Sequence, residues 1–202
     1  MLKQIISKIC ILTLVVVFLC PAEVFATEYR SYLAEKDTEQ LLKYVEVDEN
    51  GLLRFDKVTA VSDNVSADII AGGEKLEELA EAYKMYATAQ KQGIELYATV
   101  PIYGNYCGPG TETNVGDPVD YLDAKCQEHD DCYDRTGYYA CTCDTILVNV
   151  IDAKYSLMTG EQKIAAIGIR AYFKLAIDNP SEYGASPLDG KMPSCALKPQ
   201  KK

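Results

Sequence analysis

His129 is the residue of this chain whose type and surroundings most clearly suggest chemistry. It is the only histidine among 202 residues, and it lies in the segment Cys-Gln-Glu-His-Asp-Asp-Cys-Tyr. On a helix, Cys126, His129, Cys132 and Tyr133 share one broad face, because they stand three or four residues apart. A helix that cysteines pin on both sides of a histidine is rigid there, as a catalytic base requires. A lone histidine is more often structural, so its neighbours carry this prediction.

Asp144 is the partner that a helical hairpin would bring to His129. The pair Thr136-Gly137 is a turn signal. An antiparallel return from this turn sets Asp144 level with the imidazole ring. An aspartate that accepts the second N–H of a histidine fixes its tautomer and stabilises its charged form. The alternative is that Asp144 only caps or solvates its own helix.

The cysteines indicate how these helices are held. Six of the eight follow residue 100, namely Cys107, Cys126, Cys132, Cys141, Cys143 and Cys195. An even number in an exported protein favours disulfides. The hairpin register sets Cys132 opposite Cys141, with Cys143 two residues further along. A bridge from Cys132 would lock the two helices beside His129, but spacing alone does not choose its partner.

A glycine-rich segment precedes the histidine helix. Residues 103–110 read Tyr-Gly-Asn-Tyr-Cys-Gly-Pro-Gly, and glycines here let backbone carbonyls and N–H groups point into a shared cavity. Carbonyl oxygens beside the carboxylate of Asp130 form the hard-oxygen environment that Ca²⁺ prefers. Taken alone, the Gly-Pro-Gly sequence would favour an ordinary turn.

Together these motifs resemble the secreted, calcium-dependent phospholipases A2, in a compact form similar to bacterial members. The resemblance covers about residues 101–145 and rests on Tyr-Gly-x-Tyr-Cys-Gly-x-Gly, Asp-x-x-Cys-x-x-His-Asp-x-Cys-Tyr and Cys-x-Cys-Asp. It implies that His129 is the general base, that Asp144 assists it, and that the Gly108 N–H stabilises the oxyanion. It also implies Ca²⁺ as the cofactor, held by one carboxylate and three backbone carbonyls, those of Asp130, Tyr106, Gly108 and Gly110.

The resemblance further implies the disulfides and the reaction. The family pairings would be Cys107–Cys126 and Cys132–Cys143, which leaves Cys141–Cys195. The implied reaction is hydrolysis of the sn-2 ester of a glycerophospholipid at a membrane surface or micelle, giving a fatty acid and a lysophospholipid. Neutral His129 would take a proton from the attacking water.

The chain also departs from the family pattern. The connection between His129 and Asp144 is short, so the β-wing of the animal enzymes is missing. The family's second hydrogen-bonding tyrosine therefore has no assignable match. Lys125 and Asn105 stand where many members have further cysteines. Pro109 and Thr111 differ from the common loop sequence without removing a carbonyl.

The first residues predict export. A basic start, an apolar run over 9–19 and small residues before a cleavage point indicate a secretory signal over 1–26, cut after Ala26. Cleavage after Ala22, a short membrane anchor and a lipid-modified Cys20 remain alternatives. The run is shorter than the ~20 residues that span a bilayer. We therefore expect a secreted, extracellular protein.

Residues 27–100 form an acidic, cysteine-free extension or pro-region. Two β-rich runs, 44–47 and 52–55, flank Asn-Gly and predict a hairpin. Gly72-Gly73 is expected to break the chain, and the apolar spacing predicts a helix over 74–92. The extension is interpreted either as a folded spacer or as a cover over the mouth of the active site. In the second case, a protein starting near Thr99 would be the more active form.

Residues 101–202 are interpreted as the catalytic domain, with a loop-rich start. The pattern predicts three helices, over 119–135, 140–157 and 161–177. Asp117 or Asp120 would cap the first of them. The tail, 181–202, is expected to be extended. The predicted fold is mainly α, with a disulfide-linked antiparallel helix pair and a calcium-binding loop, preceded by a small α/β-hairpin extension.

Charge limits the partners. The net charge of −10 argues against nucleic acid, which needs a basic face to neutralise phosphates. We expect a monomer that meets lipid surfaces peripherally. Two other functions stay open: a non-catalytic phospholipase-like module that binds calcium and lipid or a receptor, and a zinc site built from cysteine and histidine.

Overall fold

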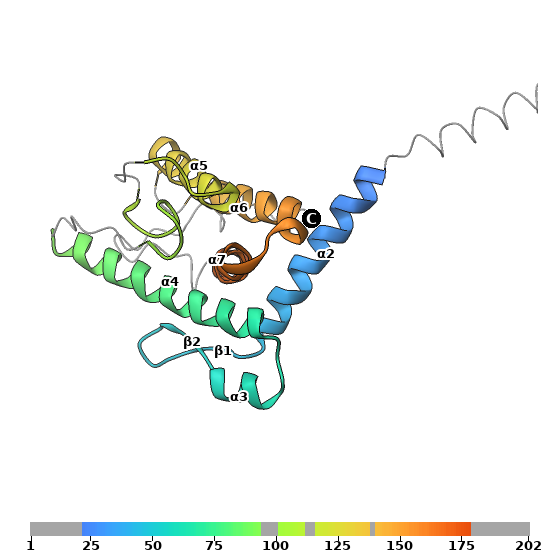
Figure 1. Ribbon diagram of the computed structural model, residues 1–202. Coiled ribbons are helices and arrows are strands. Elements are labelled where there is room, and N and C mark those ends of the chain that lie inside the picture. The colour runs from blue at the N-terminus through green and yellow to red at the C-terminus, as the bar shows by residue number, and fades with distance from the viewer. Residues whose placement is uncertain (1–21, 94–100, 112–115, 138–139, 179–202) are drawn as a thin grey trace, which may run out of the picture.

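The fold is mainly helical, as predicted, with one small antiparallel hairpin. The structure, a computed structural model, describes residues 22–93, 101–111, 116–137 and 140–178. Figure 1 shows α7 at the centre, with α4 on one side, α5 and α6 on the other, and α2 across one end. The elements are α2 (Ala22–Leu42), β1 (Val45–Val47), β2 (Leu53–Phe55), α3 (Lys57–Ser62), α4 (Ala67–Lys91), α5 (Tyr121–Thr136), α6 (Cys141–Lys154), the 3₁₀ turn η2 (Tyr155–Leu157) and α7 (Gly160–Asp178).

The predicted hairpin is confirmed. Strands β1 and β2 pair antiparallel, with Val45 opposite Phe55. The carboxylate of Asp48 accepts the backbone N–H groups of Asn50 and Leu52, and Gly51 closes the turn at a φ of 72°. Phe55 is buried, so the hairpin packs one apolar face against α4.

Helix α4 corrects one prediction. Gly72 and Gly73 do not break the chain; the helix begins at Ala67, runs through both and ends before Gly93. A Cβ at Gly72 would lie 2.4 Å from Ile167, and one at Gly73 would lie 2.5 Å from the ring of Phe55. These glycines therefore serve close packing, which outweighs their poor helix propensity of about 1 kcal/mol each.

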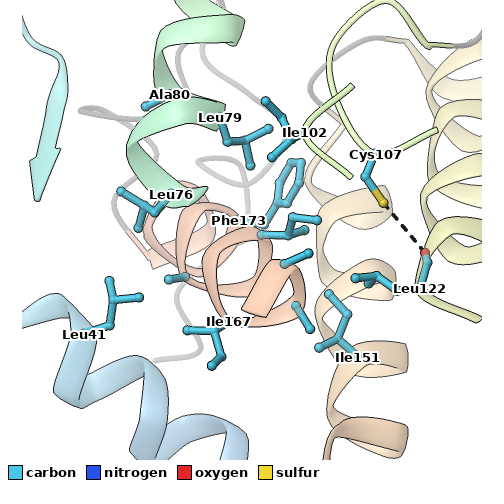
Figure 2. Packing of buried hydrophobic residues seen from close by; sticks show 14 of the residues in the cluster. Leu41, Leu76, Leu79, Ala80, Ile102, Cys107, Leu122, Ile151, Ile167 and Phe173 are labelled. Atoms are coloured by element: carbon cyan, nitrogen blue, oxygen red, sulfur yellow. Dashed lines mark hydrogen bonds between the residues drawn. The ribbon is translucent and has the colours of Figure 1, made fainter. Parts of the chain in front are cut away.

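The hydrophobic core lies between α4, α6 and α7. Figure 2 shows Leu76 and Leu79 of α4 beside Ile167 and Phe173 of α7, with Ile151 of α6 at the lower right. A Cβ at Gly168 would meet the Gly72 carbonyl at 2.6 Å, so α4 and α7 approach at backbone contact. The extension thus shares one core with the residues that follow position 100.

Helix α2, which the sequence pattern did not predict, is joined to this core by buried polar contacts. Arg170 of α7 is 2% exposed and donates to Thr38 at 2.6 Å and to Glu35 at 2.7 Å. It also pairs with Asp152 of α6 at 2.6 Å. Among the described helices, none is both long and apolar enough to cross a membrane. Most of the predicted signal, 1–21, and the predicted tail lie outside the described residues.

Helices α5 and α6 form the predicted hairpin. Asp120, rather than Asp117, caps α5 by accepting the N–H of Asp123, and Gly137 ends it at a φ of 100°. Helix α6 ends at Lys154, three residues earlier than expected, because the chain tightens into η2.

Candidate active site

His129 and Asp144 meet in the interior, as the hairpin argument predicts. The ring nitrogen Nε2 of His129 lies 2.9 Å from Oδ1 of Asp144, and the two residues are 6% and 5% exposed. The disulfide between Cys132 and Cys143 joins the helices that carry them. A carboxylate beside Nε2 favours the proton on that nitrogen, which leaves Nδ1 as the acceptor nitrogen of the neutral ring.

Tyr133 is a site residue whose role the sequence argument did not assign. Its hydroxyl donates to the same Oδ1 of Asp144 that His129 contacts. Its ring lies 4.2 Å from that of His129, centroid to centroid. Burial, together with the negative charge of Asp144, holds the pKa of Tyr133 well above its ordinary value. The phenol therefore stays protonated and serves as a permanent donor that orients the carboxylate.

A buried carboxylate, also unassigned from the sequence, shapes the glycine-rich loop. Asp123 is fully buried and accepts the backbone N–H groups of Asn105, Tyr106 and Val119 at 2.8 to 3.0 Å. Gly104 has a φ of 57°, and a Cβ there would lie 2.3 Å from the Asp123 carboxyl carbon. Only glycine allows this approach, so Gly104 and Asp123 together fix the loop against α5.

The same loop is tied to α5 covalently. Cys107 and Cys126 form a disulfide with a Cα–Cα distance of 5.0 Å. Both disulfides of the described part are those that the family resemblance implies. Because four cysteines are bonded in this way, the zinc interpretation loses its thiolate ligands. The pairing of Cys141 with Cys195 stays a prediction, since Cys195 lies outside the described residues.

Three of the four predicted metal ligands converge on one point. The carbonyl oxygens of Tyr106 and Gly108 and Oδ2 of Asp130 lie 2.6, 2.7 and 3.0 Å from the hydroxyl oxygen of Thr111. The described residues contain no group of three histidine, cysteine, aspartate or glutamate side chains that could hold a metal. A cation here would depend on carbonyls, and this donor set of hard oxygens fits Ca²⁺. The role of the Gly110 carbonyl stays a prediction.

A small cavity lies between the imidazole and these oxygens. Gly108, His129 and Asp130 line one side, and Leu79 and Tyr83 of α4 line another. Its volume is about 10 Å³. A single water molecule needs roughly this space. The cavity therefore has room for about one water molecule, and α4 of the extension forms part of its wall.

Comparisons with known proteins give one family model and several relatives that match part of the chain. Residues 98–158 match the family model of the phospholipase A2-like domain. Phospholipase A2 SSD1043 and phospholipase A2 SSD387 from Scolopendra dehaani are each 43% identical over 63 residues, which is 31% of this chain. Capsid protein VP1 of Galleria mellonella densovirus is 37% identical over 84 residues, covering 37% of this chain and 10% of the viral protein.

These matches are partial. The chain spans 39% of the length of each of the two centipede proteins. No solved structure matches. The segment that the family model matches contains His129 and Asp144, and it ends before α7. The comparisons thus confirm that residues 98–158 resemble the phospholipase A2 family.

Proposed function

We propose that this protein hydrolyses the sn-2 ester of glycerophospholipids in a calcium-dependent reaction. The observation that supports this most directly is the 2.9 Å contact between His129 and Asp144 beside a cavity of water size. The names of the centipede relatives support the same class of activity. The substrate is a phospholipid surface or micelle, and the enzyme acts there as a peripheral monomer.

The reaction uses water as the nucleophile. Nδ1 of neutral His129 takes a proton from the water, whose oxygen attacks the ester carbonyl carbon. Asp144 stabilises the imidazolium that forms, with Tyr133 holding the carboxylate in place. The Gly108 N–H donates to the developing oxyanion. Collapse of the tetrahedral intermediate breaks the bond to the glycerol oxygen, which receives the proton from His129.

The proposed metal ligands are the carbonyls of Tyr106, Gly108 and Gly110 and the carboxylate of Asp130. Bound Ca²⁺ would supply positive charge for the oxyanion and for the lipid phosphate. Asp130 is the only charged group in this proposed set. We therefore expect Asp130→Asn to lose both calcium binding and hydrolysis.

Access of lipid requires a change in the wall of the cavity. Ligand pockets measure roughly 300 to 1,000 Å³, far more than the 10 Å³ beside His129. Leu79 and Tyr83 of α4 occupy the apolar side where an acyl chain would enter. We propose that α4 covers the site and yields at a lipid surface. The alternative, a binding module without turnover, is favoured by the same small volume.

Export also belongs to the proposal. The two disulfides of the described part are typical of an oxidising compartment. The composition of residues 1–26 supports a secretory signal cut after Ala26. We therefore propose an extracellular enzyme.

The test is fatty-acid release from mixed liposomes, with Ca²⁺ or with chelator. His129→Gln should lower the rate by about 100- to 10,000-fold, the typical contribution of a general base, and should still bind Ca²⁺. Glu128→Gln, which changes an exposed neighbour on the same helix, is the matched control and should keep the rate. If wild type binds Ca²⁺ and lipid but releases no fatty acid from any phospholipid, the binding module replaces the enzyme.

A further inference from the structure

Thr111 occupies the point on which the predicted calcium ligands converge. Its side chain is fully buried, and its hydroxyl oxygen lies 2.6 Å from the Tyr106 carbonyl and 2.7 Å from the Gly108 carbonyl. The third neighbour is Oδ2 of Asp130 at 3.0 Å. All three acceptors thus share one hydroxyl donor.

One hydroxyl proton cannot satisfy three acceptors. A threonine hydroxyl donates a single hydrogen, so at least two of the three short contacts bring two oxygen atoms together without a full hydrogen bond from Thr111. One of the acceptors carries a carboxylate charge. Because the Thr111 hydroxyl is neutral, a cation at this point would compensate the carboxylate charge more fully than the hydroxyl does.

The hydroxyl and a cation cannot use this point together. Ca²⁺ binds oxygen at about 2.3 to 2.6 Å. The Thr111 oxygen is 2.6 to 3.0 Å from the same three oxygens, and a cation in contact with them on this side would overlap it. The side chain must turn away when the ion enters from that side.

We propose that the Thr111 hydroxyl holds the loop together in the calcium-free protein and competes with Ca²⁺ for the same oxygens, an inference that rests on the calcium site of the proposed function. Thr111 is then a positioning residue that sets the calcium affinity. Its hydrogen bonds stabilise only the calcium-free state. Removing them raises the free energy of that state, so the affinity for Ca²⁺ must increase.

The experiment compares Thr111→Ala with Thr111→Ser in the full chain. Both variants lose the methyl group, and only Ser keeps the hydroxyl, so their difference isolates the hydroxyl. Calorimetric titration with CaCl₂ in the absence of lipid gives the affinity, and thermal unfolding in chelator gives the stability of the calcium-free protein. We expect Ala to bind Ca²⁺ about 3- to 10-fold more tightly than Ser, as the loss of one hydrogen bond predicts. Ala should also unfold at a lower temperature in chelator.

Three outcomes overturn the proposal. Weaker binding by Ala than by Ser would make the hydroxyl a calcium ligand. Equal binding would mean that the ion approaches from the opposite side of the three oxygens. If wild type and both variants bind no Ca²⁺, the inference fails together with calcium dependence. If binding follows the expected order but no phospholipid is hydrolysed, the proposed enzyme fails and the role of Thr111 stands.

Discussion

At the scale of single residues, the site is a short hydrogen-bonded chain of buried polar groups, Tyr133, Asp144 and His129. Tyr133 and His129 stand one turn apart on α5, and both contact the same oxygen of Asp144. A carboxylate held by two donors has one orientation, and that orientation selects the tautomer of the histidine. The chemistry that we propose for His129 therefore depends on groups that never touch the lipid.

Tyr133→Phe tests this dependence. The change keeps the ring that packs on His129 and removes only the donor to Asp144. We expect kcat to fall by about 10- to 150-fold, as loss of one hydrogen bond to a charged group predicts, with KM and calcium affinity unchanged. Steady-state kinetics on mixed micelles would measure kcat and KM separately for the variant and the wild type. A change confined to KM would instead place the hydroxyl in lipid binding.

The sequence predicted the contact between His129 and Asp144 because helical spacing and a two-residue turn determine which side chains face each other. The sequence did not predict that Asp123 holds the glycine-rich loop. The carboxylate of Asp123 accepts backbone N–H groups of that loop, and every residue type except proline has such a group, so the sequence gives no sign of these hydrogen bonds. Asp123 does stand three residues before Cys126, on the buried face of the same helix. That position could have indicated a structural role for Asp123, because a carboxylate on the buried face of a helix needs hydrogen-bond donors around it.

At the scale of elements, α4 shows where local propensity misleads. Gly72-Gly73 reads as a break, yet it lies inside a helix because α7 and the hairpin approach too closely for any side chain. Such a requirement comes from a partner far along the chain. Helix α2 was not predicted for a similar reason, since the buried Arg170 that binds it comes from α7. Hairpin β1–β2 and helices α5 to α7 were predicted, because their turn and cap residues are local.

The proposed cover can be tested within the full chain. Leu79 lines the cavity beside His129, whereas Leu76, one turn earlier and equally buried, does not. Leu→Ala at either position should lower stability by about 2 to 5 kcal/mol. If α4 covers the site, only Leu79→Ala should raise hydrolysis per folded molecule. Equal rates of hydrolysis for the two variants, with folding checked by circular dichroism, would contradict the proposal that α4 covers the site.

A shortened protein is a poorer test of the same idea. Starting the chain near Thr99 would remove α4 and expose the face of α7 that contains Ile167 and Phe173. Loss of activity in that form would report unfolding rather than the absence of a necessary segment. The point variants avoid this ambiguity because the helix stays in place.

At the scale of the whole molecule, buried phenols make the protein sensitive to alkali. Burial raises the pKa of Tyr155 and of Tyr133, and burial with the neighbouring Asp120 raises that of Tyr103. The folded state then holds these protons more tightly than the unfolded chain, whose tyrosines ionise near pH ~10. Their contribution to stability is complete below that pH and is lost as the pH rises above it.

An alkaline titration would measure this effect. The chain has 15 tyrosines and no tryptophan, so absorbance near 295 nm reports phenolate without interference. We expect a first group of tyrosines to ionise reversibly, and a second group to ionise only as helical circular dichroism disappears. Tyr133→Phe should make the second step smaller. Complete ionisation near pH ~10 with full helicity would contradict the raised pKa values.

Both disulfides of the described part have one cysteine on α5, and neither joins α2 or α4. A thiol reductant would therefore release the glycine-rich loop and the catalytic hairpin, while the packing of α4 on α7 contains no bond that it can break. We expect dithiothreitol to abolish hydrolysis at concentrations that leave most helical signal intact. Inside a reducing cytoplasm, the freshly made chain would lack an assembled site. If the protein is the secreted phospholipase that we propose, the membranes of the cell that makes it would be safe until the chain is outside.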